Sequence, residues 1–348
     1  MMHDLDEVKK MFVDADNLIK ERPELFNMDI DEIFDELDDG SKEMRHIRWG
    51  VMTRAKMAEM KSFCSNDILN FMVSIKDRNL LCDYIGYVLQ AEHNVSLLEL
   101  LLNSYEKNVQ EQILPFVVSC LEYEEDCHID RIDTFLEIIE SVNENERIRT
   151  IYGYSSLILK TNNEDVIFQK YANSYSKILE YLVERIICGL FPEKESIAYK
   201  WLDRFVNEDK MYCKKTGIYL VSRSLMYNPA VFEKYYDLLE TLCDERACWE
   251  QIIGVYLQYL QNENNVLHRK SIKERLKNIK NGSIKEKRIC VREIEFKIKC
   301  ANEYFEIIEN LLESSFDKDT QILTTIDWFF DAFIDKSMIK ALEMLKDI

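Results

Sequence analysis

The chain has 348 residues, a formal net charge of −19 and a hydrophobic content of 47%. A chain of this length and hydrophobicity buries a substantial core, in one large or two ordinary domains, which excludes a largely disordered protein. Only 8 glycines and 4 prolines are present, and neither GxGxxG nor GxxxxGK[ST] occurs, which excludes folds that bind phosphate through glycine-rich loops.

The N-terminal region is strongly acidic, since residues 1–43 carry fifteen Asp or Glu and five Lys or Arg. It contains no apolar stretch typical of a secretory signal, and no run in the chain approaches the roughly eighteen apolar residues of a membrane span. DIDEIFDELDDG (29–40) resembles a calcium-binding loop only in acidity, because no register gives both Gly at position six and Glu at position twelve. We expect an acidic helix here, which could dock onto a partner or onto a basic segment of the same chain.

Ten cysteines are scattered along the chain, and none forms a CxxC pair. Most of them sit among apolar residues at helical spacing. Disulfide frameworks are typical of small secreted chains, so we expect reduced, buried thiols in a cytosolic or nuclear protein.

Two Glu-x-x-His spacings, Glu43–His46 and Glu125–His128, are typical of ligands in di-iron helical bundles. Such a site also needs two partner glutamates, and a Glu-rich chain produces this spacing by chance, so we predict no metal site and no cofactor. Cys127 beside His128 raises the alternative of a thiol nucleophile, but adjacency in sequence does not orient a base toward a thiol. We expect a linker cysteine and a solvated histidine between two helices.

Helical periodicity extends through most of the chain. Apolar residues in 132–142 follow the i, i+3, i+4, i+7 pattern, and similar stripes predict helices near 196–207, 211–226, 229–243 and 246–261. Asn228 and Pro229 are the residue types of an N-cap and a first helical residue. Short links give one helix pair about every 35 residues, which favours HEAT- or armadillo-like repeats. A helical bundle is the alternative, because periodicity alone does not separate the two.

Positive charge is concentrated in 269–299, where twelve Lys or Arg stand against four Glu, a local net charge of +8. If 270–280 is helical, several lysines share one face, and further cations follow the Asn-Gly turn signal at 281–282. Phosphate contacts require only positioned cations. The alternative is a solvated surface, or one paired with the acidic N-terminal region. The candidate RNA-contacting residues are Lys270, Lys273, Lys277, Lys280, Lys285, Lys287, Arg288 and Arg292.

One segment departs from the helical pattern. In REIEFKIK, Ile294, Phe296 and Ile298 alternate with charged residues, and the preceding RICV is also β-prone. We therefore expect a short strand or hairpin over 288–299, between two helices.

The order of these features resembles the C-terminal half of the interferon-related developmental regulator family. KSIKERLKNIKNGSI (270–284) is similar to that family's basic helix, RICVREIEFKIK (288–299) to its β-prone element, and 302–330 to the two helices that follow. YCKKTGIYLVSRSLMYN (212–228) is similar to the repeat helix that precedes them. The resemblance implies an α-solenoid that associates with the ribosome and silences translation by occupying space that tRNA or mRNA would use. It also implies that the basic face lies against ribosomal RNA and the acidic region against basic ribosomal proteins.

We therefore predict an all-α, HEAT- or armadillo-like solenoid forming one domain over 1–348, with acidic helices at 1–43, repeats at 44–268, and the basic segment with C-terminal helices at 269–348. The predicted function is a non-enzymatic ribosome-binding protein of the cytoplasm that keeps ribosomes inactive, with no small-molecule substrate and no membrane partner. The alternatives are a protein–protein scaffold or adaptor with a concave peptide groove, and a metal-dependent helical enzyme.

Overall fold

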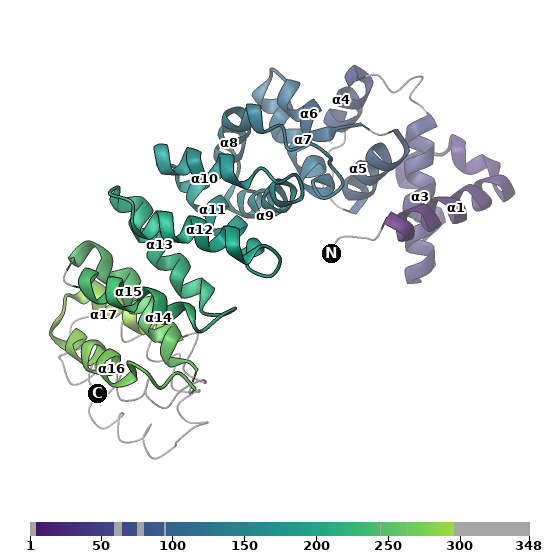
Figure 1. Ribbon diagram of the computed structural model, residues 1–348. Helices are drawn as coiled ribbons and strands as arrows, with labels where there is room; N and C mark the ends of the chain where they lie inside the picture. The colour runs from purple at the N-terminus through teal and green to yellow at the C-terminus, as the bar shows by residue number, and fades with distance from the viewer. Residues whose placement is uncertain are drawn as a thin grey trace, which may run out of the picture. The chain divides into compact units, whose positions relative to one another are not determined.

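The computed structural model describes residues 5–58, 65–74, 80–93, 95–243, 245–262 and 264–295. Every regular element in these ranges is helical, which confirms the all-α fold class (Figure 1). The chain divides into two compact units, one comprising 1–170 and 176–186, the other 171–175 and 187–348. None of the described helices is both long and apolar enough to cross a bilayer.

The first unit stacks its longer helices in succession, with α1 against α3, α3 against α5, α5 against α7, and α7 against α9. Shorter helices flank this row, for example α2 on α3 and α8 on α9. The elements are α1 (Leu5–Glu21), η1 (Pro23–Asn27), α2 (Ile30–Glu36), α3 (Lys42–Ala58), α4 (Ser65–Ser74), α5 (Leu80–His93), α6 (Leu97–Asn103), α7 (Lys107–Cys120), η2 (Ile129–Arg131), α8 (Ile132–Ser141) and α9 (Glu144–Lys160). Two further helices, α10 (Glu164–Asn173) and α11 (Lys177–Leu190), each belong partly to the first unit and partly to the second.

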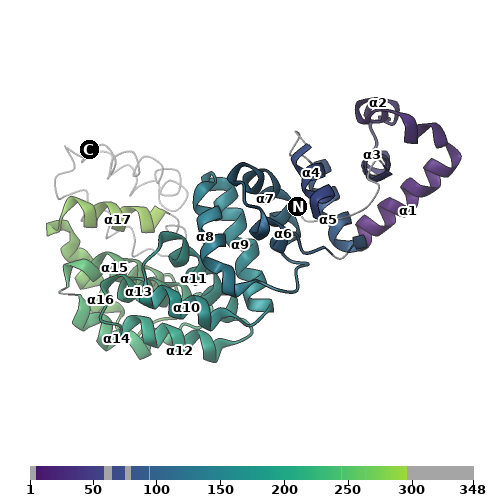
Figure 2. The same cartoon turned by 90° about the horizontal axis from the view of Figure 1, so that it is seen from above.

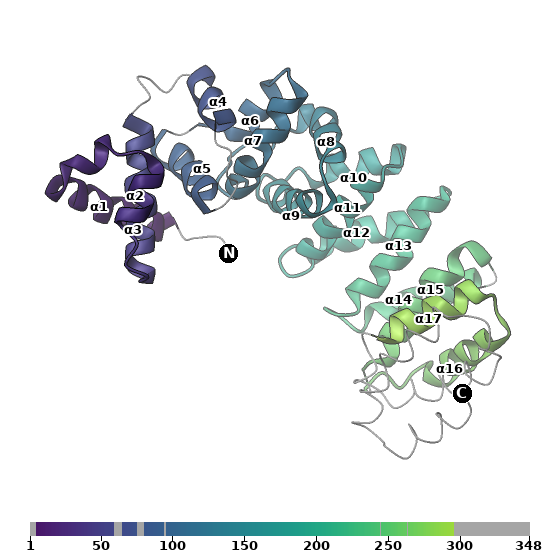
Figure 3. The same cartoon turned by 180° about the vertical axis from the view of Figure 1, so that it is seen from behind.

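The second unit repeats the same arrangement. α13, α15 and α17 pack in succession, and α12, α14 and α16 flank them (Figure 3). The elements are α12 (Glu195–Val206), α13 (Met211–Ser224), α14 (Val231–Leu242), α15 (Arg246–Leu260), α16 (Arg269–Lys277), η3 (Asn278–Asn281) and α17 (Ile284–Glu295).

Polar contacts in both units join helices one repeat apart. Arg54 and Asp16, which form an ion pair, are separated by 38 residues in the first unit. In the second unit His268 contacts Glu233 and Arg275 contacts Glu240, each across 35 residues. A helix that packs on the helix two places earlier, at a nearly constant interval, is the packing expected of stacked helix pairs. Each unit therefore has helical-repeat packing, with the period that the sequence predicts.

The helices predicted between 196 and 261 are confirmed as α12 to α15, with ends that differ by about one or two residues, the ordinary uncertainty of helix boundaries. The start of α14 is one difference. Asn228 does not cap this helix; its side chain accepts a hydrogen bond from Ala230 N (3.1 Å), and the helix begins only at Val231. Phe232, Tyr235 and Leu239 form the buried stripe as predicted.

The thiols agree with the sequence analysis where the structure describes them. Seven cysteines have described side chains; none of these seven is in a disulfide, and six of them are buried. Burial raises the pKa of Cys213 and Cys248 above the ordinary thiol value, so both stay protonated and behave as small apolar side chains.

The predicted strand or hairpin over 288–299 is wrong for residues 288–295, which lie in helix α17. A capping box starts this helix: Ser283 Oγ accepts a hydrogen bond from Glu286 N (3.3 Å), and the Glu286 carboxylate accepts one from Ser283 N. The buried Cys290 lies on the helix, which packs on α15. A satisfied N-terminus and tertiary packing outweigh the weak β propensity of RICV. Residues 296–299, with most of the alternating pattern, lie outside the described part of the chain.

Candidate nucleic-acid interface

Helix α16 separates its apolar and basic residues. Ile272 and Leu276 are buried, whereas Lys270, Lys273 and Lys277 follow one another at intervals of three and four residues along another side. Lys270 is exposed, and Lys273 and Lys277 are half-buried. Lys280 lies beyond α16 in η3, so the predicted helical face ends one turn earlier than the sequence suggested.

Helix α17 carries the other predicted cations. Lys285 and Arg288 are exposed and Lys287 is half-buried, all in the first half of the helix. Arg292 lies on the same helix, but its side chain is outside the described part of the structure. The cations predicted as one segment are thus distributed over two helices and η3.

The two basic helices lie on different sides of α15 (Figure 2). α16 contacts α15 and reaches α14, where the Tyr236 hydroxyl donates to Ser271 Oγ at 3.2 Å. α17 packs on α15 alongside the row that includes α13. The lysines of α16 and those of α17 therefore form two separate clusters within one unit.

Carboxylates from the preceding repeat contact part of this basic segment. Lys285 Nζ lies 2.7 Å from Glu250 Oε1, and Arg275 Nη2 lies 2.8 Å from Glu240 Oε2. The hydrogen bond to Glu240 raises the pKa of Arg275 above its ordinary value. The Lys285 side chain is 72% exposed, so its pair with Glu250 is solvent-screened and worth little free energy. Such a pair can exchange for a phosphate oxygen.

The Glu-x-x-His spacings do not form a metal centre in the part of the chain that the structure describes, where no group of three or more His, Cys, Asp or Glu could hold an ion. Glu43 and His46 lie on α3, beside a shallow pocket that Lys10 also lines. His128 is in the left-handed region (φ 45°) just before η2, so Glu125 and His128 do not share a helix face. The prediction that this segment is a link between helices is confirmed for 125–128, but the prediction of a solvated histidine is wrong, because the His128 side chain is only 17% exposed.

Cys127 does not contact the neighbouring His128 as a nucleophile would contact its base. The thiol is buried and accepts a hydrogen bond from Asn163 Nδ2 at 3.2 Å. Burial raises the pKa of Cys127, which disfavours the reactive thiolate.

A polar cluster that the sequence analysis missed lies at the start of α6. The Glu124 carboxylate accepts hydrogen bonds from Leu97 N (2.8 Å), Leu98 N (3.1 Å) and Ser96 Oγ (2.9 Å). Ser96 Oγ is also 3.5 Å from His128 Nε2. The Ser96 proton is directed to Glu124 and the backbone amides are already bonded, so the cluster caps a helix and lacks the geometry of a catalytic serine.

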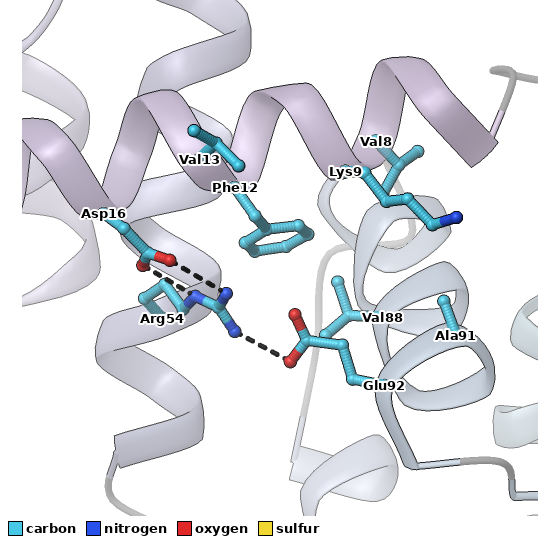
Figure 4. A pocket seen from close by; sticks show the side chains of 9 residues that line it. All are labelled: Val8, Lys9, Phe12, Val13, Asp16, Arg54, Val88, Ala91 and Glu92. Atoms are coloured by element: carbon cyan, nitrogen blue, oxygen red, sulfur yellow. Dashed lines mark hydrogen bonds and ion pairs between the residues drawn. The ribbon is translucent and has the colours of Figure 1, made fainter.

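A pocket of about 350 Å³ opens between α1, α3 and α5 in the first unit (Figure 4). Phe12 and Val88 supply much of its apolar wall. Arg54 crosses one end, where its Nε donates to Asp16 (3.0 Å) and its Nη1 to Glu92 (2.8 Å). Partial burial lowers the pKa of Arg54, but the bonds to Glu92 and Asp16 outweigh this and raise it. Both carboxylates are hydrogen-bonded to Arg54 and most of the other lining residues are apolar, so the pocket suits an apolar side chain.

No protein-family model matches this chain, and no curated protein matches its sequence. The resemblance to interferon-related developmental regulators thus has no support from a family model. The resemblance implies a helical architecture, and the described part of the chain is helical. Residues 302–330, which carry half of the resemblance, lie outside the described part of the chain.

Proposed function

We propose that this chain is a non-enzymatic, cytoplasmic protein that binds ribosomes through the cations of α16 and α17 and keeps them translationally inactive. The observation that carries the proposal is the concentration of Lys and Arg on two helices that follow one another in the sequence and both pack on α15, in an otherwise acidic protein. Screening confines electrostatic effects to roughly 10 Å, so the net charge of −19 does not cancel a local basic surface.

The packing of the two helices supports this role. Helices α16 and α17 each bury an apolar side against α15 or η3. This packing fixes the backbone that carries the lysines before a partner binds. Preorganised cations lose less conformational entropy on meeting phosphates than cations on a flexible tail. Ribosomal RNA offers a dense, fixed array of phosphates to such a surface.

The test is co-sedimentation of the full chain with purified ribosomes. The variant Lys273→Gln/Lys277→Gln/Arg288→Gln removes one cation from the centre of α16, one from its end and one from α17. Each lost phosphate contact weakens a salt-dependent interaction, so we expect the variant to bind at least about tenfold more weakly.

A matched control separates local charge from net charge. Lys9→Gln/Lys107→Gln/Lys177→Gln removes the same three charges from exposed sites of the first unit. The control variant should sediment like the wild type. Equal binding of all three proteins, or equal weakening of both variants, would overturn the assignment to α16 and α17.

A protein–protein scaffold is the second candidate, and the pocket of Figure 4 favours it. An apolar side chain of a partner peptide would fit between Phe12 and Val88, as anchor residues do in helix-in-groove complexes. A sucrose gradient distinguishes the two functions. A ribosome-bound protein moves to light fractions after nuclease treatment, whereas a scaffold bound only to protein does not change position.

A further inference from the structure

Three polar contacts join α14 to the start and the middle of α16 at one constant interval in the sequence. They pair Glu233 with His268, Tyr236 with Ser271, and Glu240 with Arg275, each across 35 residues. On each side the contacting residues follow one another at i, i+3 and i+7, so they share one face of their helix. The two members of each pair advance together along the chain, so the two helices run parallel. We call these six residues the polar ladder.

Both oxygens of the Glu240 carboxylate are engaged. Its Oε2 accepts hydrogen bonds from Arg275 Nε (3.2 Å) and Nη2 (2.8 Å). Its Oε1 accepts a hydrogen bond from the hydroxyl of Tyr256, which lies on α15. Hydrogen bonds to a charged group are stronger than those between neutral groups. Glu240 therefore ties α14, α15 and α16 together at one point.

The other end of the polar ladder fixes where α16 begins. His268 Nε2 lies 3.0 Å from Glu233 Oε2, and the His268 ring stacks on Tyr236 with the ring centroids 3.5 Å apart. His268 has a φ of 60°, in the left-handed region that is costly for a residue with a side chain. Its contacts with α14 hold this turn in place, so they also hold the first turn of α16.

The polar ladder sets the rotation of α16 about its own axis. At roughly 100° per residue, the ladder residues lie about 160° around the helix from Lys270, Lys273 and Lys277. The buried Ile272 and Leu276 occupy the side between them. The three lysines are therefore carried on the side of α16 that is turned away from α14.

Charge and geometry make opposite predictions for Glu240. Its negative charge lies beside a basic helix, so charge alone predicts that its removal strengthens the binding of an anion. Its contacts hold that helix, and preorganised cations bind phosphates at a lower entropic cost than mobile ones. We propose that the polar ladder positions Lys270, Lys273 and Lys277 to meet phosphates together, with Glu240 as the main positioning residue. This inference rests on the ribosome-binding function proposed above.

The test is ribosome co-sedimentation of the full chain over a series of KCl concentrations, with two variants that lose the same charge. Glu240→Ala removes both acceptors, whereas Glu240→Gln retains an amide that can hydrogen-bond to Arg275 and Tyr256. We expect Glu240→Ala to bind about fivefold more weakly and with a shallower dependence on salt, because phosphate contacts of α16 are lost. Glu240→Gln should bind at least as tightly as the wild type. A variant that was only partly unfolded would keep the salt dependence of the wild type.

Glu250→Ala is the matched control. Glu250 also reaches a cation of the basic segment from the preceding repeat, and its side chain is 22% exposed, against 23% for Glu240. Its partner Lys285 is 72% exposed, so the control releases a cation and should bind as tightly as the wild type or more tightly. Unchanged or tighter binding of Glu240→Ala would overturn the proposal. Equal weakening of Glu240→Ala and Glu240→Gln would also overturn it, because charge and not position would then be responsible.

Amide hydrogen exchange separates the polar ladder from the proposed function. Exchange in α16 should be faster in Glu240→Ala than in the wild type and Glu240→Gln, with no change in α12 and α13. If the wild type does not bind ribosomes, the proposed function fails, and this exchange pattern still shows that the polar ladder holds α16. Equal exchange of α16 in all three proteins would refute the polar ladder, whatever the wild type binds.

Discussion

Glu124 is a buried carboxylate on which opposing effects act. Burial raises its pKa, because the charged form loses its hydration. Hydrogen bonds from Leu98 N, Ser96 Oγ and Leu97 N favour the charged form, and the net effect is a raised pKa. The stability that Glu124 gives to the N-terminus of α6 therefore depends on pH.

The raised pKa of Glu124 predicts a direction for stability against pH. Between the ordinary carboxyl pKa and the raised value, the folded chain binds a proton that the unfolded chain does not. The free energy of unfolding therefore falls as pH rises through this window. Relative to Glu124→Gln, which does not titrate, the wild type should gain stability as pH is lowered from neutral toward about 4.5. Urea unfolding of both proteins at several pH values measures this difference, and a constant or reversed difference would refute the pKa assignment.

The cap of α6 was only half predictable from sequence. Ser96 and Glu99 have the S-x-x-E spacing of a capping box, and Ser96 Oγ does accept a hydrogen bond from Glu99 N at 3.2 Å. Glu124 lies 28 residues beyond Ser96, and its role depends on tertiary packing. No local pattern contains that information.

Helices α12 and α13 approach each other closely at Gly217. A Cβ on Gly217 would lie 2.6 Å from Val206 N and 2.9 Å from Phe205 C, which are backbone atoms that cannot rotate away. Gly153 in α9 is a contrasting case, since a Cβ there would meet Leu121 Cδ1 at 2.9 Å, the flexible end of a side chain. Substitutions at the two glycines therefore distinguish the effect of close helix packing from the effect of helix propensity.

Gly217→Ala should therefore destabilise the protein by about 1–3 kcal/mol, because the two helices must move apart. Gly153→Ala should change stability by less than about 1 kcal/mol, because the gain in helix propensity offsets a small rearrangement of Leu121. Chemical denaturation of both variants measures the comparison. A neutral or stabilising Gly217→Ala would show that α12 and α13 are not in this contact.

At the scale of single helices, the sequence predicts an element well where one residue pattern dominates. The apolar stripes of α12 to α15 have no competing signal, and their ends were predicted closely. In α17 the Ser283–Glu286 capping box competes with the alternation that starts at Ile294. The alternation predicts a strand, whereas the capping box and the buried Cys290 favour the helix that forms.

At the scale of the whole molecule, charge is distributed unevenly along a helical chain. The acidic region at 1–43 and the basic segment at 269–299 are readable in the sequence, because local net charge needs no structure. The contacts of those charges were not readable. Glu240 and Glu250 reach Arg275 and Lys285 across one repeat, an interval that only the stacking of helices explains. The basic surface available to a partner is therefore smaller than the sequence suggests.

The most direct test of binding through α16 and α17 is the salt dependence of the ribosome dissociation constant. It would be measured in a series of KCl concentrations for the wild type and for Lys273→Gln/Lys277→Gln/Arg288→Gln. We predict that the logarithm of affinity falls linearly with the logarithm of salt concentration, and that the slope of the variant is shallower by about two to three, the value for three lost phosphate contacts. Equal slopes for the two proteins, or no ribosome binding by the wild type at any salt concentration, would contradict the account.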